Sequence, residues 1–198
     1  MIQYLVTFRP KLTLWFITIL FFSGLILAFF SQLGEYTILF PSNLKQPWNW
    51  YKLITYPFAG VGLLNWLTNS LVLILTGYII ENHIIRSDMI KIIILSSVIG
   101  GLIFIIFNQN DVYNRGIASP TMISWGYWAA TIIIGVKFWR ELNLFEKIIL
   151  ILCFLSITSL FFEDIGFLLG QIAVIICIMT FTLIRIKNNK LMPTRTIK

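Results

Sequence analysis

Hydrophobic residues in this 198-residue chain gather in six long runs that are separated by more polar stretches. A helix needs about 20 mostly apolar residues to cross a hydrocarbon core about 30 Å thick. The fifth run is short for this purpose, and a start nearer Leu144 would lengthen it. The pattern predicts an all-α, polytopic membrane protein with six transmembrane helices. The runs cover residues 12–30, 63–80, 90–107, 120–136, 148–162 and 165–186.

The composition agrees with this pattern. Hydrophobic residues make up 58% of the chain and charged residues 12%, whereas a soluble domain is nearer half apolar and a quarter charged. No stretch is rich enough in Gly, Ser or Pro to be a linker, so residues 1–198 are expected to form a single domain. The first run follows Arg9 and Lys11 and lacks a small-residue cleavage site, which indicates an uncleaved first span.

Lysine and arginine residues are distributed unevenly between the two sides that six spans would define. One side carries 12 of them and the other carries 3, so the positive-inside rule predicts cytoplasmic termini in a cell (plasma or inner) membrane. The net charge of +7 is then a signal of topology. It predicts contact with anionic membrane lipids and does not indicate nucleic-acid binding. The three residues on the other side are Lys45, Lys52 and Arg115.

The cysteine and histidine residues offer no metal or cofactor site. Cys153 and Cys177 lie inside apolar runs without a neighbouring histidine, so we expect two free thiols and no disulfide or metal centre. The only histidine, His83, lies between Glu81 and Arg86 just past the second run. We interpret it as a solvated residue at the membrane surface, not as a catalytic one.

The stretch 31–62 is a long first outer loop that is rich in aromatic residues and prolines. Aromatic side chains at this density prefer the interface between lipid and water, so we expect one or two short helices there. Its aromatic residues include Trp48, Trp50, Tyr51, Tyr56 and Phe58, and its prolines are Pro41, Pro47 and Pro57.

Polar and small residues inside the runs indicate which faces meet protein. Asn65 and Asn69 are four residues apart on one helical face, and an amide in hydrocarbon must find a partner or a water-filled cavity. Pairs of small residues four apart allow helices to approach closely. Such pairs are Ser96 with Gly100, Ser97 with Gly101, and Gly166 with Gly170.

Asp164 stands directly before the last run and has two interpretations. It is either a first-turn acid that the helix dipole favours, or an acid placed inside a site.

Several segments, taken together in their order and spacing, resemble the rhomboid intramembrane serine protease family. The resemblance covers about residues 45–175 and implies a rhomboid-like bundle with six spans. Tyr51–Phe58 is similar to the family's Trp-Arg loop motif with its Thr-Tyr-x-Phe run, and Asn65-xxx-Asn69 and Gly77-xxx-Glu81 follow it. Ile117-Ala-Ser-Pro120 falls where the family has Gly-x-Ser-Gly, and Asp164–Gly170 falls where it has the catalytic His and a glycine-rich helix.

The resemblance assigns catalytic positions, and the departures fall on them. Ser119 stands at the position of the nucleophile and Asp164 at that of the base, while Asn65 and Asn69 stand at the oxyanion positions. An ordinary aspartate has a pKa of about 3.9 and is a poor proton acceptor near neutral pH. Pro120 has no N–H and suits a first helical turn, so Ser119 is interpreted as a structural cap.

The resulting hypothesis is a rhomboid-like pseudoprotease that binds transmembrane segments or serves as a subunit of a membrane complex. Its expected partners are membrane lipids and a transmembrane client or partner protein, with no nucleic acid, metal or cofactor. The alternative is an active intramembrane serine endopeptidase that uses Ser119. A transporter or channel is a weaker third hypothesis, because no span outside this region carries a charge for a substrate path.

Overall fold

The structure is a computed structural model that describes residues 10–59, 62–109, 115–156 and 164–187. Within these ranges the regular structure is helical, apart from an isolated antiparallel bridge between Leu39 and Ile117. The predicted all-α class is therefore confirmed. The longer helices are α2 (Lys11–Phe29), α5 (Leu63–His83), α6 (Arg86–Phe107), α7 (Thr121–Lys137), α8 (Leu144–Ser156) and α9 (Ile165–Lys187).

Four of these helices, α2, α5, α6 and α9, are long and apolar enough to cross a membrane, with 19 to 23 residues each. Their bounds lie close to the first, second, third and sixth predicted runs. Helix α7 has 17 residues, and α8 has 13 described residues. Residues 157–162, the predicted end of the fifth span, lie outside the described residues.

The first outer loop contains more helical segments than the one or two predicted. Prolines at the first position open two of them, where the missing N–H costs no hydrogen bond. The segments are η1 (Ser31–Leu33), α3 (Gly34–Thr37), η2 (Pro41–Lys45), η3 (Pro47–Asn49), α4 (Lys52–Thr55) and η4 (Tyr56–Phe58).

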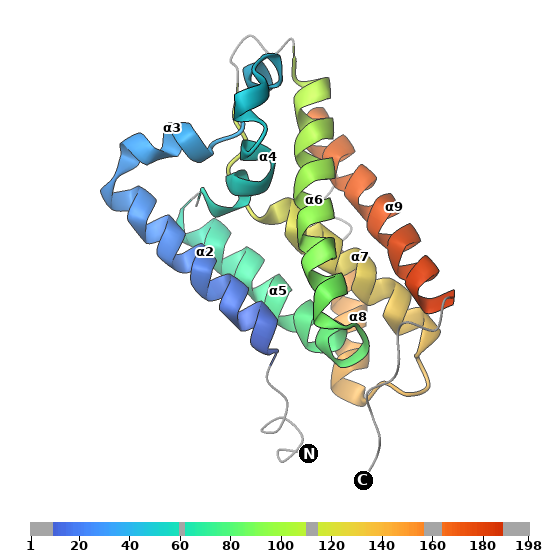
Figure 1. Cartoon of the computed structure of the whole chain (residues 1–198). Coiled ribbons are helices and arrows are strands. Elements are labelled where there is room, and N and C mark those ends of the chain that lie inside the picture. The colour runs from blue at the N-terminus through green and yellow to red at the C-terminus, as the bar shows by residue number, and fades with distance from the viewer. Residues whose placement is uncertain (1–9, 60–61, 110–114, 157–163, 188–198) are drawn as a thin grey trace.

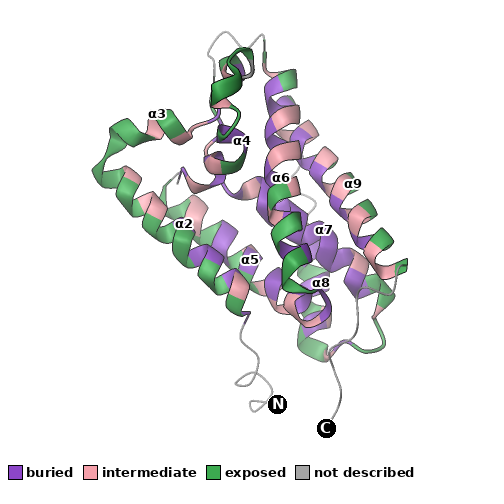
Figure 2. Cartoon of the chain, viewed as in Figure 1, coloured by how far each residue is buried: buried purple, intermediate pink, exposed green. Residues whose placement is uncertain are grey.

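Helix α7 lies at the centre of the bundle. Thirteen of its 17 residues are buried, and it packs against α5, α6, α8 and α9 (Figures 1 and 2). Its glycines allow close approach: a Cβ on Gly126 would overlap the Ser96 side chain of α6, and one on Gly135 would overlap Leu150 of α8. Helix α2 lies at the edge of the bundle and exposes much of its surface (Figure 2).

The two small-residue pairs of α6 face different neighbours. A Cβ on Gly170 of α9 would lie 3.1 Å from the carbonyl oxygen of Gly100, so this pair does bring two helices together as predicted. A Cβ on Gly101 would instead lie 2.9 Å from Leu39 and 3.1 Å from Tyr56, both in the first outer loop. The second pair, Ser97 with Gly101, therefore packs against the first outer loop and not against a neighbouring helix as predicted.

The first outer loop is fastened to that face of α6 by two hydrogen bonds. Ser97 Oγ donates to the carbonyl of Leu53 at 2.7 Å, and the hydroxyl of Tyr56 donates to the carbonyl of Ser97 at 3.1 Å. Lys52 is also buried here, and its Nζ donates to the carbonyl of Glu35 at 2.6 Å. Burial lowers the pKa of Lys52, and the charge of Glu35 partly opposes that shift.

Near the C-terminal end of α5, the side chain of Glu81 binds the start of α2. Its carboxylate accepts the backbone N–H of Thr13 at 2.8 Å and that of Leu12 at 3.3 Å, which satisfies donors of the first helical turn. His83 lies in the last turn of α5 and is only 8% exposed. The prediction of a solvated histidine is wrong, because Phe138 after α7 covers the ring at a centroid distance of 5.3 Å.

Candidate functional site

The candidate site lies where the loop before α7 meets the first turn of α5 and the start of α9. Ser119 is 7% exposed and lies two residues before the helix, which begins at Thr121. Its Oγ accepts the backbone N–H of Thr121, the first residue of the helix, at 3.3 Å. Pro120, with φ of −73° and ψ of 5°, occupies the N-cap position itself, so the helix starts one residue later than predicted.

Five polar side chains from α5 and the start of α7 form one hydrogen-bonded chain. Ser124 Oγ donates to Asn69 Oδ1 at 2.7 Å, and Asn69 Nδ2 lies 3.3 Å from Thr121 Oγ1. The hydroxyls of Thr121 and Ser119 are 2.6 Å apart, and Ser119 Oγ donates to Asn65 Oδ1 at 3.0 Å. Asn65 and Asn69 therefore share a face that meets protein, as their spacing predicts.

The direction of this chain follows from its last acceptor. An amide oxygen can only accept, so Ser119 donates its single hydroxyl proton to Asn65 and receives the one from Thr121. Asn69 Nδ2 also donates to Asn65 Oδ1 at 3.0 Å. The proton of Ser119 thus points at a neutral amide oxygen, which does not act as a general base. The amide nitrogen of Asn65 makes no hydrogen bond with the described residues and can donate to an entering group.

Asp164 lies directly before α9 and pairs with a cation. Its Oδ2 is 3.1 Å from Nη1 of Arg115, and the side chains of Asp164 and Arg115 are 76% and 60% exposed. The hydrogen bonds of Ser119 to the described residues go to Asn65 and Thr121. The structure therefore places Asp164 near the site, with its carboxylate directed to Arg115 and not to Ser119.

The loop that carries Ser119 is held by the first outer loop. Ile117 donates its N–H to the carbonyl of Leu39 at 2.8 Å, and Leu39 donates to the carbonyl of Ile117 at 3.0 Å. The side chain of Ile117 is 3% exposed. A Cβ on Gly116 would lie 2.5 Å from Ile38 and 2.7 Å from Phe40, so only glycine allows this approach. The first outer loop and the loop before α7 are thus joined by backbone hydrogen bonds beside Ser119.

Two hollows meet at Asn65. The larger has a volume of about 760 Å³ and is lined by Ser119, Asn65, Asp164 and Arg115 among other residues. The smaller, of about 230 Å³, lies between α5, α7 and α8. Its polar lining residues are Asn65, Thr68, Asn69, Thr121, Ser124 and Ser156.

Sequence reasoning missed Thr121 and Ser124, which complete the polar chain, and Arg115, which pairs with Asp164. Thr121 and Ser124 are three residues apart at the start of an apolar run, and that spacing is a signal of a shared polar face. No signal in the sequence links Arg115 to Asp164, because 49 residues separate them.

Comparison with known proteins gives one family. A family model described as Rhomboid domain matches residues 47–183, which is more than half of the chain and includes all four predicted site residues. No curated protein and no solved structure matches the chain.

Proposed function

The chain belongs to the rhomboid family of multi-pass membrane proteins, and we propose that it is a pseudoprotease that binds transmembrane segments or serves as a subunit of a membrane complex. The observation that carries this proposal is the hydrogen bond from Ser119 Oγ to Asn65 Oδ1. A serine hydroxyl is a weak nucleophile until a base removes its proton, and an amide oxygen does not do so.

The carboxylate at the base position supports the same conclusion. Asp164 is engaged by Arg115 and is largely exposed. A guanidinium partner stabilises the charged carboxylate where it is and competes with any interaction with Ser119. Loss of one catalytic group from a serine-protease triad lowers the rate by several powers of ten.

The histidine is too far away to act in place of Asp164. His83 lies 18 residues beyond Asn65 on the same helix, which corresponds to about 27 Å along the helix axis. It is buried against Phe138 at the other end of α5. A proton cannot pass directly from Ser119 to this ring.

The binding role rests on polar groups at membrane depth. The smaller hollow presents hydroxyls and amides from α5 and α7, groups that hydrocarbon cannot satisfy. A client helix with polar residues, or with backbone groups freed by Gly or Pro, would find hydrogen-bond partners there. Helix α7, which forms one side of this hollow, packs in turn against α6 and α9.

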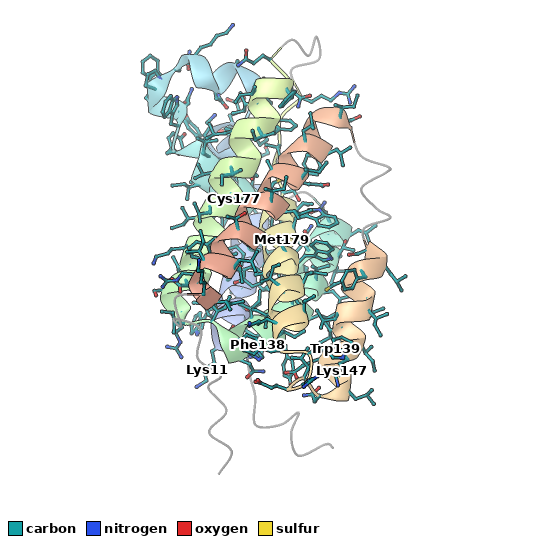
Figure 3. All side chains as sticks on the ribbon, turned by 90° about the vertical axis from the view of Figure 1, so that its right-hand side faces the viewer. Lys11, Phe138, Trp139, Lys147, Cys177 and Met179 are labelled. Carbon is teal, nitrogen blue, oxygen red and sulfur yellow. The ribbon has the colours of Figure 1, made fainter. Side chains whose placement is uncertain are left out.

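We also propose six spans in one domain, with both termini in the cytoplasm of a cell membrane. Lys11, Phe138, Trp139 and Lys147 lie at the same end of the molecule (Figure 3). Both lysines belong to the side that carries 12 of the 15 lysine and arginine residues in the six-span prediction. Helix α7 would cross as the buried centre of the bundle despite its 17 residues. The fifth span is proposed from the apolar run 148–162, and α8 (Leu144–Ser156) is the described helix in that region.

A paired experiment separates the proposal from the alternative, an active endopeptidase. The full chain in bilayer nanodiscs is treated with a serine-directed phosphonate probe, and crosslinking is measured to two model transmembrane peptides. One peptide carries a central Gly-Pro and polar residues, and the other is all leucine. The proposal predicts no labelling of Ser119, preferential crosslinking of the first peptide, and unchanged crosslinking in Ser119→Ala. Labelling of wild type that is lost in Ser119→Ala would establish the enzyme instead.

A further inference from the structure

The turn that joins α7 to α8 carries three basic residues in the stretch 137–147. Lys137 and Arg140 are exposed, and Lys147 is half-buried. No salt bridge among the described residues uses any of the three. Glu141 is the one exposed carboxylate in the stretch, so its exposed charge is net positive. We call residues 137–147 the basic turn.

Hydrogen bonds hold the basic turn in one conformation. Glu141 donates its N–H to the carbonyl of Phe138 at 2.8 Å. Asn143 and Glu146 cap α8 reciprocally, because the N–H of each donates to the side chain of the other at 2.9 Å. Asn82 Nδ2 also lies 3.3 Å from Glu146 Oε1. The carboxylate of Glu146 is therefore buried and occupied by donors of the protein.

Lys147 is placed by an aromatic ring of the same turn. Its Nζ lies 5.3 Å from the centroid of the Trp139 ring (Figure 3). A cation over the face of an indole is attracted by the ring, which restricts a side chain that is otherwise flexible. Trp139 is 47% exposed, so a ligand can reach both the ring and the ammonium group.

The surroundings of the basic turn indicate the class of ligand. Val136 before it is 67% exposed and Leu144 at the start of α8 is 69% exposed, which in a membrane protein are positions for lipid. Tryptophan prefers the level of the lipid headgroups, and Lys and Arg bind phosphate. A soluble acidic ligand would leave the apolar neighbours unused. We propose that the basic turn binds the phosphate of an anionic glycerophospholipid, with Arg140 and Lys147 as donors.

This site differs from a general attraction between a basic surface and anionic lipid, because it assigns the binding to one turn. It requires that α7 and α8 end at the membrane surface. It does not depend on whether Ser119 is active, so phosphonate labelling of Ser119 and lipid binding at the basic turn can fail independently of each other.

The test compares two pairs of variants with the same loss of charge. Native mass spectrometry of the full chain measures binding of phosphatidylglycerol and of phosphatidylcholine with the same acyl chains. Arg140→Gln with Lys147→Gln should weaken phosphatidylglycerol binding about 25-fold, or about fivefold for each basic residue, and leave phosphatidylcholine binding unchanged. The control, Lys11→Gln with Arg86→Gln, changes two exposed residues of the same predicted side and should weaken binding less than about threefold.

Two further variants test the ring and the charges separately. Trp139→Leu should weaken phosphatidylglycerol binding about two- to fivefold, the range for an exposed cation–π contact, whereas Trp15→Leu on α2 should not. The exchange Arg140→Lys with Lys147→Arg keeps both charges and should retain most of the binding.

Equal weakening by the two glutamine pairs would overturn the proposal, because it would show a general attraction without a site. Displacement of phosphatidylglycerol from wild type by an equal concentration of soluble poly-glutamate would also overturn it, and would identify an acidic protein segment as the ligand.

Discussion

Arg185 at the end of α9 donates two hydrogen bonds to the carboxylate of Asp88 at the start of α6. Its Nε lies 2.6 Å from Oδ2 of Asp88, and its Nη2 lies 2.7 Å from Oδ1. Asp88 is fully buried, and Lys91 adds a third contact at 3.2 Å. The two residues are 97 positions apart in sequence, and their ion pair joins α9 to α6.

Removal of one partner should destabilise the protein more than removal of both. Arg185→Met leaves the buried charge of Asp88 with Lys91 alone, and breaking a buried pair in this way typically costs about 3 kcal/mol or more. The double variant Arg185→Met with Asp88→Leu should recover most of that loss. Unfolding in mixed micelles with increasing denaturing detergent measures both. Equal destabilisation by the single and double variants would refute this account of the pair.

Tyr56 should make stability fall in alkaline solution. Burial raises the pKa of Tyr56 well above its ordinary value of 10, despite its hydrogen bond to Ser97. Above pH 10 the unfolded chain releases this proton and the folded chain keeps it, so the free energy of unfolding decreases as pH rises. The difference between wild type and Tyr56→Phe isolates this residue from the other tyrosines. Below pH 10, Tyr56→Phe should cost about 1 kcal/mol for the lost hydrogen bond, and the cost should shrink above pH 10.

Gly170→Ala should separate α9 from α6. The new Cβ would meet the backbone oxygen of Gly100 at 3.1 Å, and a backbone atom cannot move aside as a side chain can. A loss of about 1 to 3 kcal/mol is expected from this overpacking. Gly34→Ala is the matched control, because its Cβ would lie at an ordinary 3.6 Å from Ile38. Similar stability of the two variants would contradict the close approach.

Restoring a histidine at position 164 should restore little activity on its own. Asp164→His removes the partner of Arg115 but leaves Pro120 and Ile117 beside Ser119, and a misplacement of about 1 Å can cost a hundredfold in rate. Adding Pro120→Gly and Ile117→Gly should give measurable phosphonate labelling of Ser119. Wild-type labelling that is lost in Asp164→Asn and retained in Glu163→Gln would instead show that the aspartate acts as a base.

Cysteines at positions 45 and 190 should be labelled from opposite sides of the membrane. The uneven distribution of lysine and arginine predicts that position 45 faces outward and position 190 the cytoplasm. The assay needs a background in which Cys153 and Cys177 are replaced, since both are free thiols. Labelling from the same side would refute the six-span topology.

The sequence predicted the long helices well and their contacts poorly. Run length sets the helix bounds, so the run 165–186 corresponds to α9 at Ile165–Lys187. Lipid and protein interior are both apolar, so hydrophobicity alone does not say which face of a span meets a neighbour. For this reason Ser97 and Gly101 were expected to meet a helix and instead receive the loop that contains Tyr56.

The sequence predicted several polar residues of the site but not which residues pair with one another. The sequence predicted that Asn65 and Asn69 face protein or water, because an amide in hydrocarbon needs a hydrogen-bond partner. The choice of Arg115 as the partner of Asp164 depends on how two distant loops fold, which no local pattern encodes. The burial of His83 has a similar origin, because the residue that covers it, Phe138, is 55 positions away in the sequence.

The bridge between Leu39 and Ile117 makes the first outer loop and the loop before α7 mechanically dependent on each other. Ser119 is two residues from Ile117, so the first outer loop cannot lift away from the bundle without breaking two backbone hydrogen bonds or carrying Ser119 with it. Amide hydrogen exchange at Leu39 and Ile117 would then accelerate together whenever the loop opens. A bound partner that displaces the first outer loop would therefore also displace the residues at the start of α7.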